Sequence, residues 1–196
     1  MKDVSRETAA LLDFYEKLLR RWNSKINLVG DKTLMEFHTR HVQDSLQLLD
    51  CVDSMPSSWV DMGSGGGLPG IVVAAALGDA TSVTLIESDG RKCAFLRTAV
   101  RGMKLRNVTV LNARIEAVPV QSADIVSARA LAPLPALLQF VSRHIAPDGV
   151  ALLPKGRGWR EEITAAQLDW QFHYEALPSK TDPEAVVLKI SKVSRA

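Results

Sequence analysis

The chain has 196 residues, of which 46% are hydrophobic, and a formal net charge of +2. This length suits one domain with a sizeable core, alone or with a small appendage. No apolar run is long enough to cross a membrane and residues 1–7 contain no apolar signal core, so we expect a cytoplasmic protein. Cys51 and Cys93 are too few for a disulfide framework and are expected to be free thiols.

The first 55 residues are predicted to form a helical cap. A helix is expected from Ser5, its N-cap, to about Trp22, because apolar residues recur there at helical spacing. A second helix is expected from about Leu34 to Cys51. The rest of the chain, residues 56–196, is then predicted to be one compact domain.

After Ser58 the pattern changes to short β-rich runs that alternate with helical stretches. Strands are predicted at residues 59–61, 83–87, 108–111, 124–127 and 150–153, with helices at 68–77 and 91–103. Such alternation predicts an α/β fold with helices on both faces of a mostly parallel, seven-stranded sheet. Runs at 171–175 and 185–190 have no clear helix between them, so we expect them to pair antiparallel and to add a reversed edge strand.

The segment Asp61-Met-Gly-Ser-Gly-Gly-Gly-Leu-Pro-Gly70 directly follows the first predicted strand. Glycines let the backbone turn tightly and let a ligand touch the main chain. As Gly65-x-Gly67-x-x-Gly70 the segment fits a dinucleotide fingerprint, which is a weak signal alone. As Asp61-x-Gly63-x-Gly65-x-Gly67 it fits an S-adenosylmethionine (SAM) methyltransferase. The acid before the glycines and the β-rich carboxyl-terminal region favour SAM.

Other side chains are predicted to reach the same crevice, because ligands in open α/β sheets bind beyond the carboxyl ends of the strands. Glu87 ends the second strand and can accept hydrogen bonds from a ribose diol. Ile115 and Glu116 follow the third strand, where Ile115 can cover an adenine face. Arg129 lies at the end of the fourth strand.

Several of these strings together resemble one family. Two of these strings lie in the cap: Trp22-Asn-x-x-Ile-Asn27-Leu and Arg40-His41-x-x-Asp44-Ser45-Leu46. The others lie in the domain: the Asp61–Gly70 loop, Leu85-Ile-Glu87-Ser88 with Arg91-Lys92, Arg114-x-Glu116, Ser127-Ala-Arg129-Ala130 and Leu153-Pro-Lys155-Gly156. Over most of its length the chain is similar to the bacterial small-subunit rRNA guanine-N7 methyltransferases (RsmG, also called GidB). The resemblance implies a Rossmann-like SAM-dependent methyltransferase fold and a methyl acceptor in the decoding-region loop of 16S rRNA.

The resemblance also implies SAM contacts at Gly63, Leu68, Ile115, Glu116 and Arg129, beside the contacts expected from the pattern at Asp61, Gly65, Gly67 and Glu87. Gly66 stands where the family usually has Ala, and Arg91 replaces the first of two usual lysines. Asp182-Pro-Glu-Ala185 departs from the Glu-Arg-His expected before the last strand, which puts a carboxyl-terminal role in RNA contact in doubt.

Guanine N7 carries a free lone pair, so methyl transfer to it needs no general base. The enzyme then has to position the base, and Arg129 and Lys155 are the predicted catalytic residues that orient the guanine or its phosphates. An alternative is that both only hold the site together by pairing with Glu116 or Glu87.

The cap carries a polar cluster, and a basic segment follows it in the chain. Asn27, His41, Asp44 and Ser45 are predicted to pack the cap on the domain or to reach the methionine end of SAM; His38 and His41 have ligand-like spacing, but no metal site is expected. Residues 90–115 contain seven basic residues and no acid. The predicted RNA-binding residues are Arg97, Arg101, Lys104, Arg114 and Lys155.

Two other functions remain open from the residues alone. A nicotinamide or flavin oxidoreductase would bind NADH and not S-adenosylhomocysteine (SAH). A non-catalytic rRNA-binding module would carry a damaged glycine loop, whereas this loop is intact. The expected partner is 16S rRNA, the small ribosomal subunit or its precursor, with no membrane, and the protein is expected to be a monomer.

Overall fold

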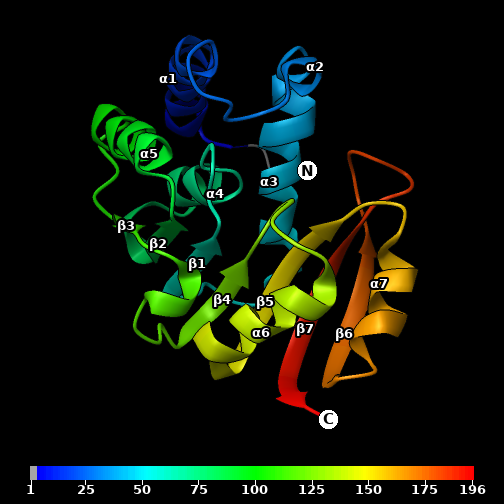
Figure 1. Cartoon of the computed structure of the whole chain (residues 1–196). Helices are drawn as coiled ribbons and strands as arrows, with labels where there is room; N and C mark the ends of the chain where they lie inside the picture. The colour runs from blue at the N-terminus through cyan, green and yellow to red at the C-terminus, as the bar shows by residue number, and fades with distance from the viewer. Residues whose placement is uncertain (1–3) are drawn as a thin grey trace.

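The structure is a computed structural model that describes residues 4–196. Residues 1–3 of the segment 1–7, in which we expect no signal core, lie outside the described residues. Figure 1 shows a twisted sheet with helices on both faces and further helices above the ends of its central strands. None of the helices in the described part of the chain is both long and apolar enough to cross a membrane.

The first helix, α1 (Arg6–Asn23), confirms the prediction from the apolar spacing. The Ser5 hydroxyl caps it by accepting a hydrogen bond from the Thr8 amide at 3.0 Å. Its buried apolar stripe includes Leu12, Tyr15 and Leu19, and it packs on α4 and α5.

The second predicted helix is helical but not regular. It divides into α2 (Asp31–Leu34), a π-helical turn η1 (His38–Gln43), α3 (Asp44–Leu46) and a 3₁₀ turn η2 (Gln47–Cys51). The predicted helix is therefore confirmed from Phe37 to Cys51, although its hydrogen bonding changes from π-helical to 3₁₀ along its length and a turn separates it from Leu34. The wide turn is stabilised from within, since the Ser45 hydroxyl donates to the His41 carbonyl at 2.6 Å. A π-helical turn shifts the side chains relative to a regular helix, and such turns often occur at functional sites.

Seven strands form one sheet in the order β3-β2-β1-β4-β5-β7-β6. They are β1 (Ser58–Met62), β2 (Ser82–Glu87), β3 (Val108–Asn112), β4 (Ala123–Ser127), β5 (Ile145–Lys155), β6 (Trp170–Pro178) and β7 (Val186–Arg195). The first five are parallel, which confirms the predicted fold class. The reversed strand is β7, and it is not at the edge: it lies between β5 and β6 and runs antiparallel to both. After β5 the chain leaves one strand position empty and forms β6 beyond it, and β7 then returns to fill the position between β5 and β6.

The two faces of the sheet bury two hydrophobic clusters. Within β1 the side chains alternate, so that Trp59 joins one cluster while Val60 and Met62 join the other. The first cluster is covered by α1, α4 (Gly70–Leu77) and α5 (Gly90–Gly102). The second is covered by α6 (Leu134–His144) and α7 (Trp159–Ala166). Short turns η3 (Gly78–Ala80) and η4 (Ile115–Ala117) follow α4 and β3.

Helix α4 begins at Gly70, which lies in close contact with the sheet. A Cβ at this position would be 2.3 Å from Leu85 Cδ2 and 2.8 Å from Asp61 Oδ2. The close approach of α4 to β1 and β2 therefore requires glycine at its first residue.

We predict that Gly70→Ala lowers the free energy of unfolding by about 1–3 kcal/mol, because the added methyl group overpacks this contact. Gly156→Ala is the control, since a Cβ there meets no atom within 4 Å. Urea unfolding of both variants measures the difference. Equal stability of the two variants would show that the contact at Gly70 relaxes without loss.

Candidate functional site

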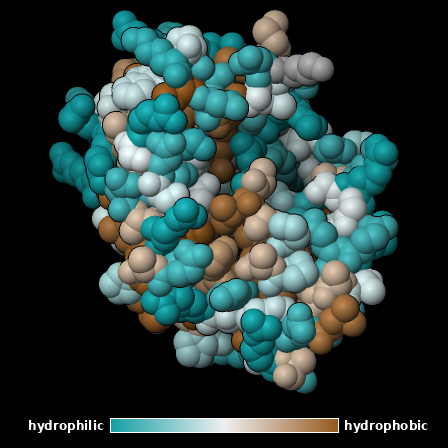
Figure 2. Space-filling model, in the orientation of Figure 1, coloured by the Kyte–Doolittle hydropathy of each residue, from teal (hydrophilic) through white to brown (hydrophobic). Residues whose placement is uncertain are grey.

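A cavity of about 870 Å³ lies where the parallel strands end and the cap begins. Its lining comes from three parts of the chain: the cap, the glycine loop, and the segments that follow β4 and β5. Figure 2 shows the hollow in the upper half of this face of the molecule, with hydrophilic residues around much of its rim. This position agrees with the crevice predicted from the strand ends.

The glycine loop forms one wall, and its conformation depends on three left-handed residues. Gly63, Gly65 and Gly67 have φ values of 66°, 54° and 85°, a region that side chains rarely adopt. A Cβ on Gly65 would meet no protein atom closer than 3.8 Å, so this part of the backbone is open toward the cavity. A cofactor that lies along the main chain fits such a wall.

The cap holds this loop from behind. The buried Tyr15 hydroxyl of α1 donates a hydrogen bond to the Gly66 carbonyl. Gly66 also lies against the cap segment that follows α1, with the Leu28 carbonyl 3.2 Å from the position of a Cβ. An alanine at this position would therefore make a tight contact with the cap backbone.

Asp61 lies below the loop and is the end of a buried chain of hydrogen bonds. Trp59 Nε1 donates to Ser127 Oγ at 2.9 Å, and Ser127 Oγ donates to Asp61 Oδ1 at 2.7 Å. Asp61 Oδ2 is buried with no hydrogen-bond partner among the described residues. Burial raises the pKa of Asp61 to about 6, although the hydrogen bond from Ser127 opposes the shift.

Glu87 also supports the loop. Its Oε2 accepts a hydrogen bond from the Gly65 amide at 2.9 Å, and its Oε1 accepts one from the Asp89 amide at 2.8 Å. A carboxylate has about four lone-pair positions, so both oxygens can still accept from a ribose. Ile115 and Glu116 form the η4 turn after β3, where Ile115 is buried and Glu116 is exposed. Neither lines the cavity, so the contact of Ile115 with adenine and the contact of Glu116 with SAM remain predictions.

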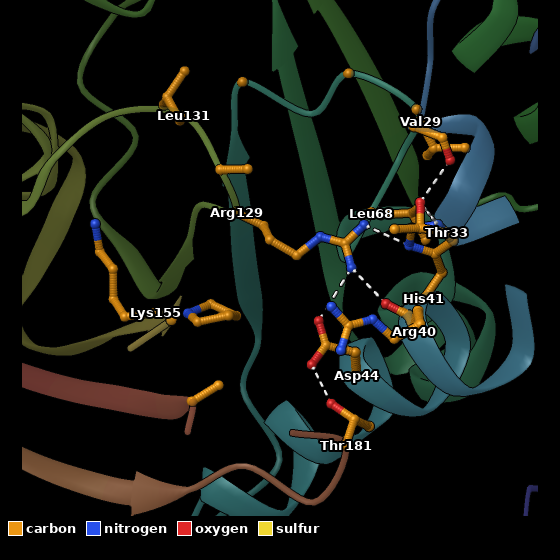
Figure 3. A pocket seen from close by; sticks show the side chains of 18 of the residues that line it. Val29, Thr33, Arg40, His41, Asp44, Leu68, Arg129, Leu131, Lys155 and Thr181 are labelled. Atoms are coloured by element: carbon orange, nitrogen blue, oxygen red, sulfur yellow. Dashed lines mark hydrogen bonds and ion pairs between the residues drawn. The ribbon is translucent and has the colours of Figure 1, made fainter. Parts of the chain in front are cut away.

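Arg129, two residues beyond β4, crosses the cavity to the cap, as Figure 3 shows. Its Nη1 donates to Asp44 Oδ2 at 3.1 Å and to the Arg40 carbonyl at 3.2 Å. Its Nη2 lies 3.1 Å from His41 Nδ1, and His41 Nε2 lies 3.1 Å from the Thr33 hydroxyl. Burial, and then the charge of Arg129, lower the pKa of His41 to about 4. A neutral His41 therefore accepts from Arg129 and donates to Thr33.

These contacts correct one sequence-based alternative. Arg129 pairs with Asp44 of the cap and Lys155 with Glu162 of α7, whereas the alternative paired them with Glu116 or Glu87. The sheet order explains the difference, because β4 and β5 lie on the side of β1 away from β2 and β3. Lys155 Nζ donates to Glu162 Oε2 at 2.7 Å and to the Ala132 carbonyl at 3.0 Å.

The structure brings most of the predicted site residues to one place. The cavity is lined by Gly63, Gly65, Leu68, Arg129, Lys155, Asn27, His41 and Asp44. Asp61, Gly67 and Ser45 lie directly behind this wall and are buried. The described residues contain no group of three or more potential metal ligands.

The predicted RNA-binding residues on α5 lie elsewhere. Arg97, Arg101 and Lys104 are exposed and line a separate shallow depression of about 410 Å³ between α5 and β3, together with Arg106. Their apolar neighbours Phe95, Leu96 and Ala99 are buried, as the helical spacing predicts. Arg114 is exposed after β3. The exposed cations thus form a basic face at the β3 edge of the sheet.

Sequence reasoning gave no role to Glu162, Thr33 or Thr181, all of which line the cavity. Thr181, in the β6–β7 loop, donates to Asp44 Oδ1 at 2.9 Å. Glu162 sits in the first turn of a short helix that has no motif. Only the position of that helix beside the end of β5 could have indicated it.

Comparison with solved structures identifies the fold. A SAM-dependent methyltransferase from Aquifex aeolicus superposes with a TM-score of 0.62 and 12% identity, over 89% of this chain and 97% of that one. TYW2 from M. jannaschii, solved in complex with AdoMet, gives a TM-score of 0.58 and 18% identity, over 88% and 80%. The fold is that of SAM-dependent methyltransferases.

Sequence comparison then defines the family. The ribosomal RNA small subunit methyltransferases G of Cereibacter sphaeroides and Paracoccus denitrificans are 49% and 48% identical to this chain. Each alignment covers 98% of this chain, and 94% and 99% of the relatives. Residues 8–185 match the profile of GidB, rRNA small subunit methyltransferase G, and the chain belongs to this family. The predicted family, fold class and SAM cofactor are confirmed.

The raised pKa of Asp61 predicts a pH-dependent difference in stability. Because the folded state raises this pKa from 3.8 to about 6, the stability contributed by Asp61 falls as the pH rises through that window, and is constant above it. Asp61→Asn removes this pH-dependent contribution to stability, because the amide does not titrate. We predict that stability shifts in favour of the variant by roughly 2–3 kcal/mol between pH 4 and pH 7.

Urea unfolding of both proteins at several pH values measures this shift. The comparison with the variant is needed because His41 acts in the opposite direction. Its pKa is lowered on folding, so its contribution rises with pH between about 4 and 6.5. A stability difference that does not change with pH would contradict the raised pKa of Asp61.

Proposed function

We propose that this protein uses SAM to methylate N7 of a specific guanine in the decoding-region loop of 16S rRNA. The observation that carries the proposal is membership of the small-subunit rRNA methyltransferase G family over residues 8–185. The site chemistry supports it. The groups in the lining that could act as a general base each bind a cation through at least one atom: His41 and Asp44 bind Arg129, Glu162 binds Lys155 through Oε2, and Asp182 binds Arg40. An acceptor such as N7, which needs no general base, suits this site.

The glycine loop fits SAM by its geometry, with an open backbone at Gly65 above a buried carboxylate at Asp61. We propose that Gly63, Gly65 and Leu68 contact the cofactor directly, with Asp61 and Gly67 shaping the loop and Glu87 receiving the ribose. Ile115 and Glu116 are proposed to contact the adenine. When bound, SAM supplies an electrophilic methyl group.

The contribution of the protein is then orientation, which can supply up to roughly 7–11 kcal/mol of a barrier. Both Arg129 and Lys155 line the cavity, and Figure 3 shows Lys155 on the side of Arg129 away from the cap. We propose that they orient the guanine or its phosphates. A donor on N7 would block the reaction, so the usual bidentate contact of a cation with O6 and N7 is excluded during transfer.

The basic face on α5 is proposed to bind the backbone of the same RNA, with the target guanine unstacked to enter the cavity. We further propose that the enzyme acts in the cytoplasm, as a monomer, on rRNA or a small-subunit particle. The division into a cap of residues 1–55 and a domain of residues 56–196 remains a prediction.

One experiment tests the proposed function directly. The protein is incubated with labelled SAM and small-subunit rRNA, or small subunits, from a strain that lacks the activity, and the modified base is mapped. Label at N7 of one guanine in the decoding-region loop is the expected result. Label on another base or atom would contradict the proposal, and binding of NADH without SAH would favour an oxidoreductase.

For Arg129→Ala we predict a loss of roughly 10- to 100-fold in methylation rate, the size expected for a lost charge-assisted contact. Arg20→Ala is the matched control, because Arg20 also binds an acid, Glu16, and a cap carbonyl, that of Leu34, outside the cavity. A near wild-type rate in the Arg129 variant would exclude Arg129 from the reaction.

For the basic face we predict that joint neutralisation of Arg97, Arg101 and Lys104 weakens RNA binding. It should also flatten the dependence of log K on log salt by about 2, since each phosphate contact to single-stranded RNA contributes about 0.7. Lys189, Lys192 and Arg195 of β7 provide a control with the same charge change. If the salt slope stays at its wild-type value, the α5 residues are only a solvated surface.

A further inference from the structure

The wall of the cavity opposite the cap contains an ion pair that is only partly used. Lys155 Nζ donates to Glu162 Oε2 and to the Ala132 carbonyl. Since an ammonium has three donors, one remains. Glu162 Oε2 also accepts from the Leu134 amide at 2.6 Å, while Glu162 Oε1 accepts no hydrogen bond from the described residues. The ion pair therefore offers the cavity one free donor, on Lys155 Nζ, and one free acceptor, Glu162 Oε1.

The pair is fixed in place before any ligand binds. The Leu134 amide orients the Glu162 carboxylate, and the Ala132 carbonyl orients the ammonium of Lys155. The Lys155 side chain is 8% exposed and that of Glu162 is 30% exposed. The lining next to them is largely apolar, with Pro133, Pro154 and Val186. Because the pair is oriented beforehand, a ligand with mismatched groups would leave partly buried polar atoms unpaired, and this discriminates between ligands.

The free groups match one edge of guanine. Its Watson–Crick edge presents a carbonyl oxygen, O6, next to two donors, N1–H and N2–H₂. A cation beside a carboxylate is complementary to that order. Adenine presents the reverse, with an amino group in place of O6 and a bare lone pair at N1, so it would place donor on donor and acceptor on acceptor.

We propose that Glu162 is the residue that selects guanine: its Oε1 accepts from N1–H and N2–H₂, while the remaining Lys155 proton donates to O6. N7 lies on the other edge of the base and stays free of donors, as methyl transfer requires. This inference rests on the proposed function, because it takes guanine as the acceptor. It gives Lys155 a specific partner atom and gives Glu162 a role in specificity.

The test compares guanosine with inosine at the target position of the rRNA, placed there by ligation of synthetic RNA. Inosine lacks only the N2 amino group and keeps N7. For the wild-type enzyme we expect kcat/KM to be roughly 10- to 100-fold higher with guanosine, the discrimination of one good polar contact. For Glu162→Ala we expect this ratio to fall to within about twofold of one, because the amino group has lost its acceptor.

Glu161→Ala is the matched control: Glu161 is in the same helical turn, carries the same charge and is exposed. It should keep the wild-type ratio. Glu162→Gln provides a second, nearly isosteric variant. The carbonyl oxygen of the new glutamine can still accept from the Leu134 amide. The glutamine amino group then faces the donors of the base in place of the acceptor Oε1, so we expect the guanosine-to-inosine ratio to fall here too. Titration with SAH verifies that each variant retains the cofactor site.

Two results would overturn the inference: a wild-type enzyme that does not distinguish guanosine from inosine, or Glu162 variants that keep the wild-type ratio although their rates fall. The second result would show that Glu162 only supports the cavity wall. Failure of the proposed function appears separately, as the absence of N7 label on the guanosine RNA with wild-type enzyme, and it would overturn both proposals.

Discussion

The hydrogen bond from Tyr15 to the Gly66 carbonyl sets the position of the glycine loop, and the cavity depends on that position. Tyr15 is fully buried between Phe37 and Phe95, and burial raises the pKa of its hydroxyl, which therefore remains a donor. Three positions of the loop have a backbone conformation that only glycine adopts easily. A glycine-rich backbone loses much conformational entropy when it is fixed in one conformation. A fixed donor behind the loop and the Glu87 carboxylate at the Gly65 amide restrict it from two sides.

The second connection between cap and sheet is ionic and crosses the cavity itself. Arg129 satisfies Asp44, the Arg40 carbonyl and His41 together, and Asp44 in turn accepts from Thr181 of the β6–β7 loop. Arg129 therefore joins the segment after β4 to the cap, and Asp44 joins the cap to the β6–β7 loop. Removal of either ionic partner would leave the other uncompensated in a partly buried site. The same cation that is proposed to orient the acceptor thus also joins the cap to the strand ends.

The sequence predicted those features that depend on local pattern. The spacing of apolar residues predicted α1, alternation of β and α runs predicted the parallel sheet, and the acid-glycine string predicted the loop and its cofactor. The π-helical turn at His38–Gln43 and the place of β7 inside the sheet were missed, because each depends on tertiary packing. Pairing partners were missed for the same reason: Asp44 and Glu162 reach Arg129 and Lys155 only after the strand order is known.

We infer that the cap and the strand ends build the cofactor site together. Hydrogen exchange with and without SAH tests it most directly, because it reports on the amides of both parts in the intact protein. With SAH bound, we expect slower exchange in residues 63–68 of the glycine loop and also in residues 27–33 and 40–44 of the cap. Protection limited to the glycine loop, with exchange in the cap unchanged, would contradict it.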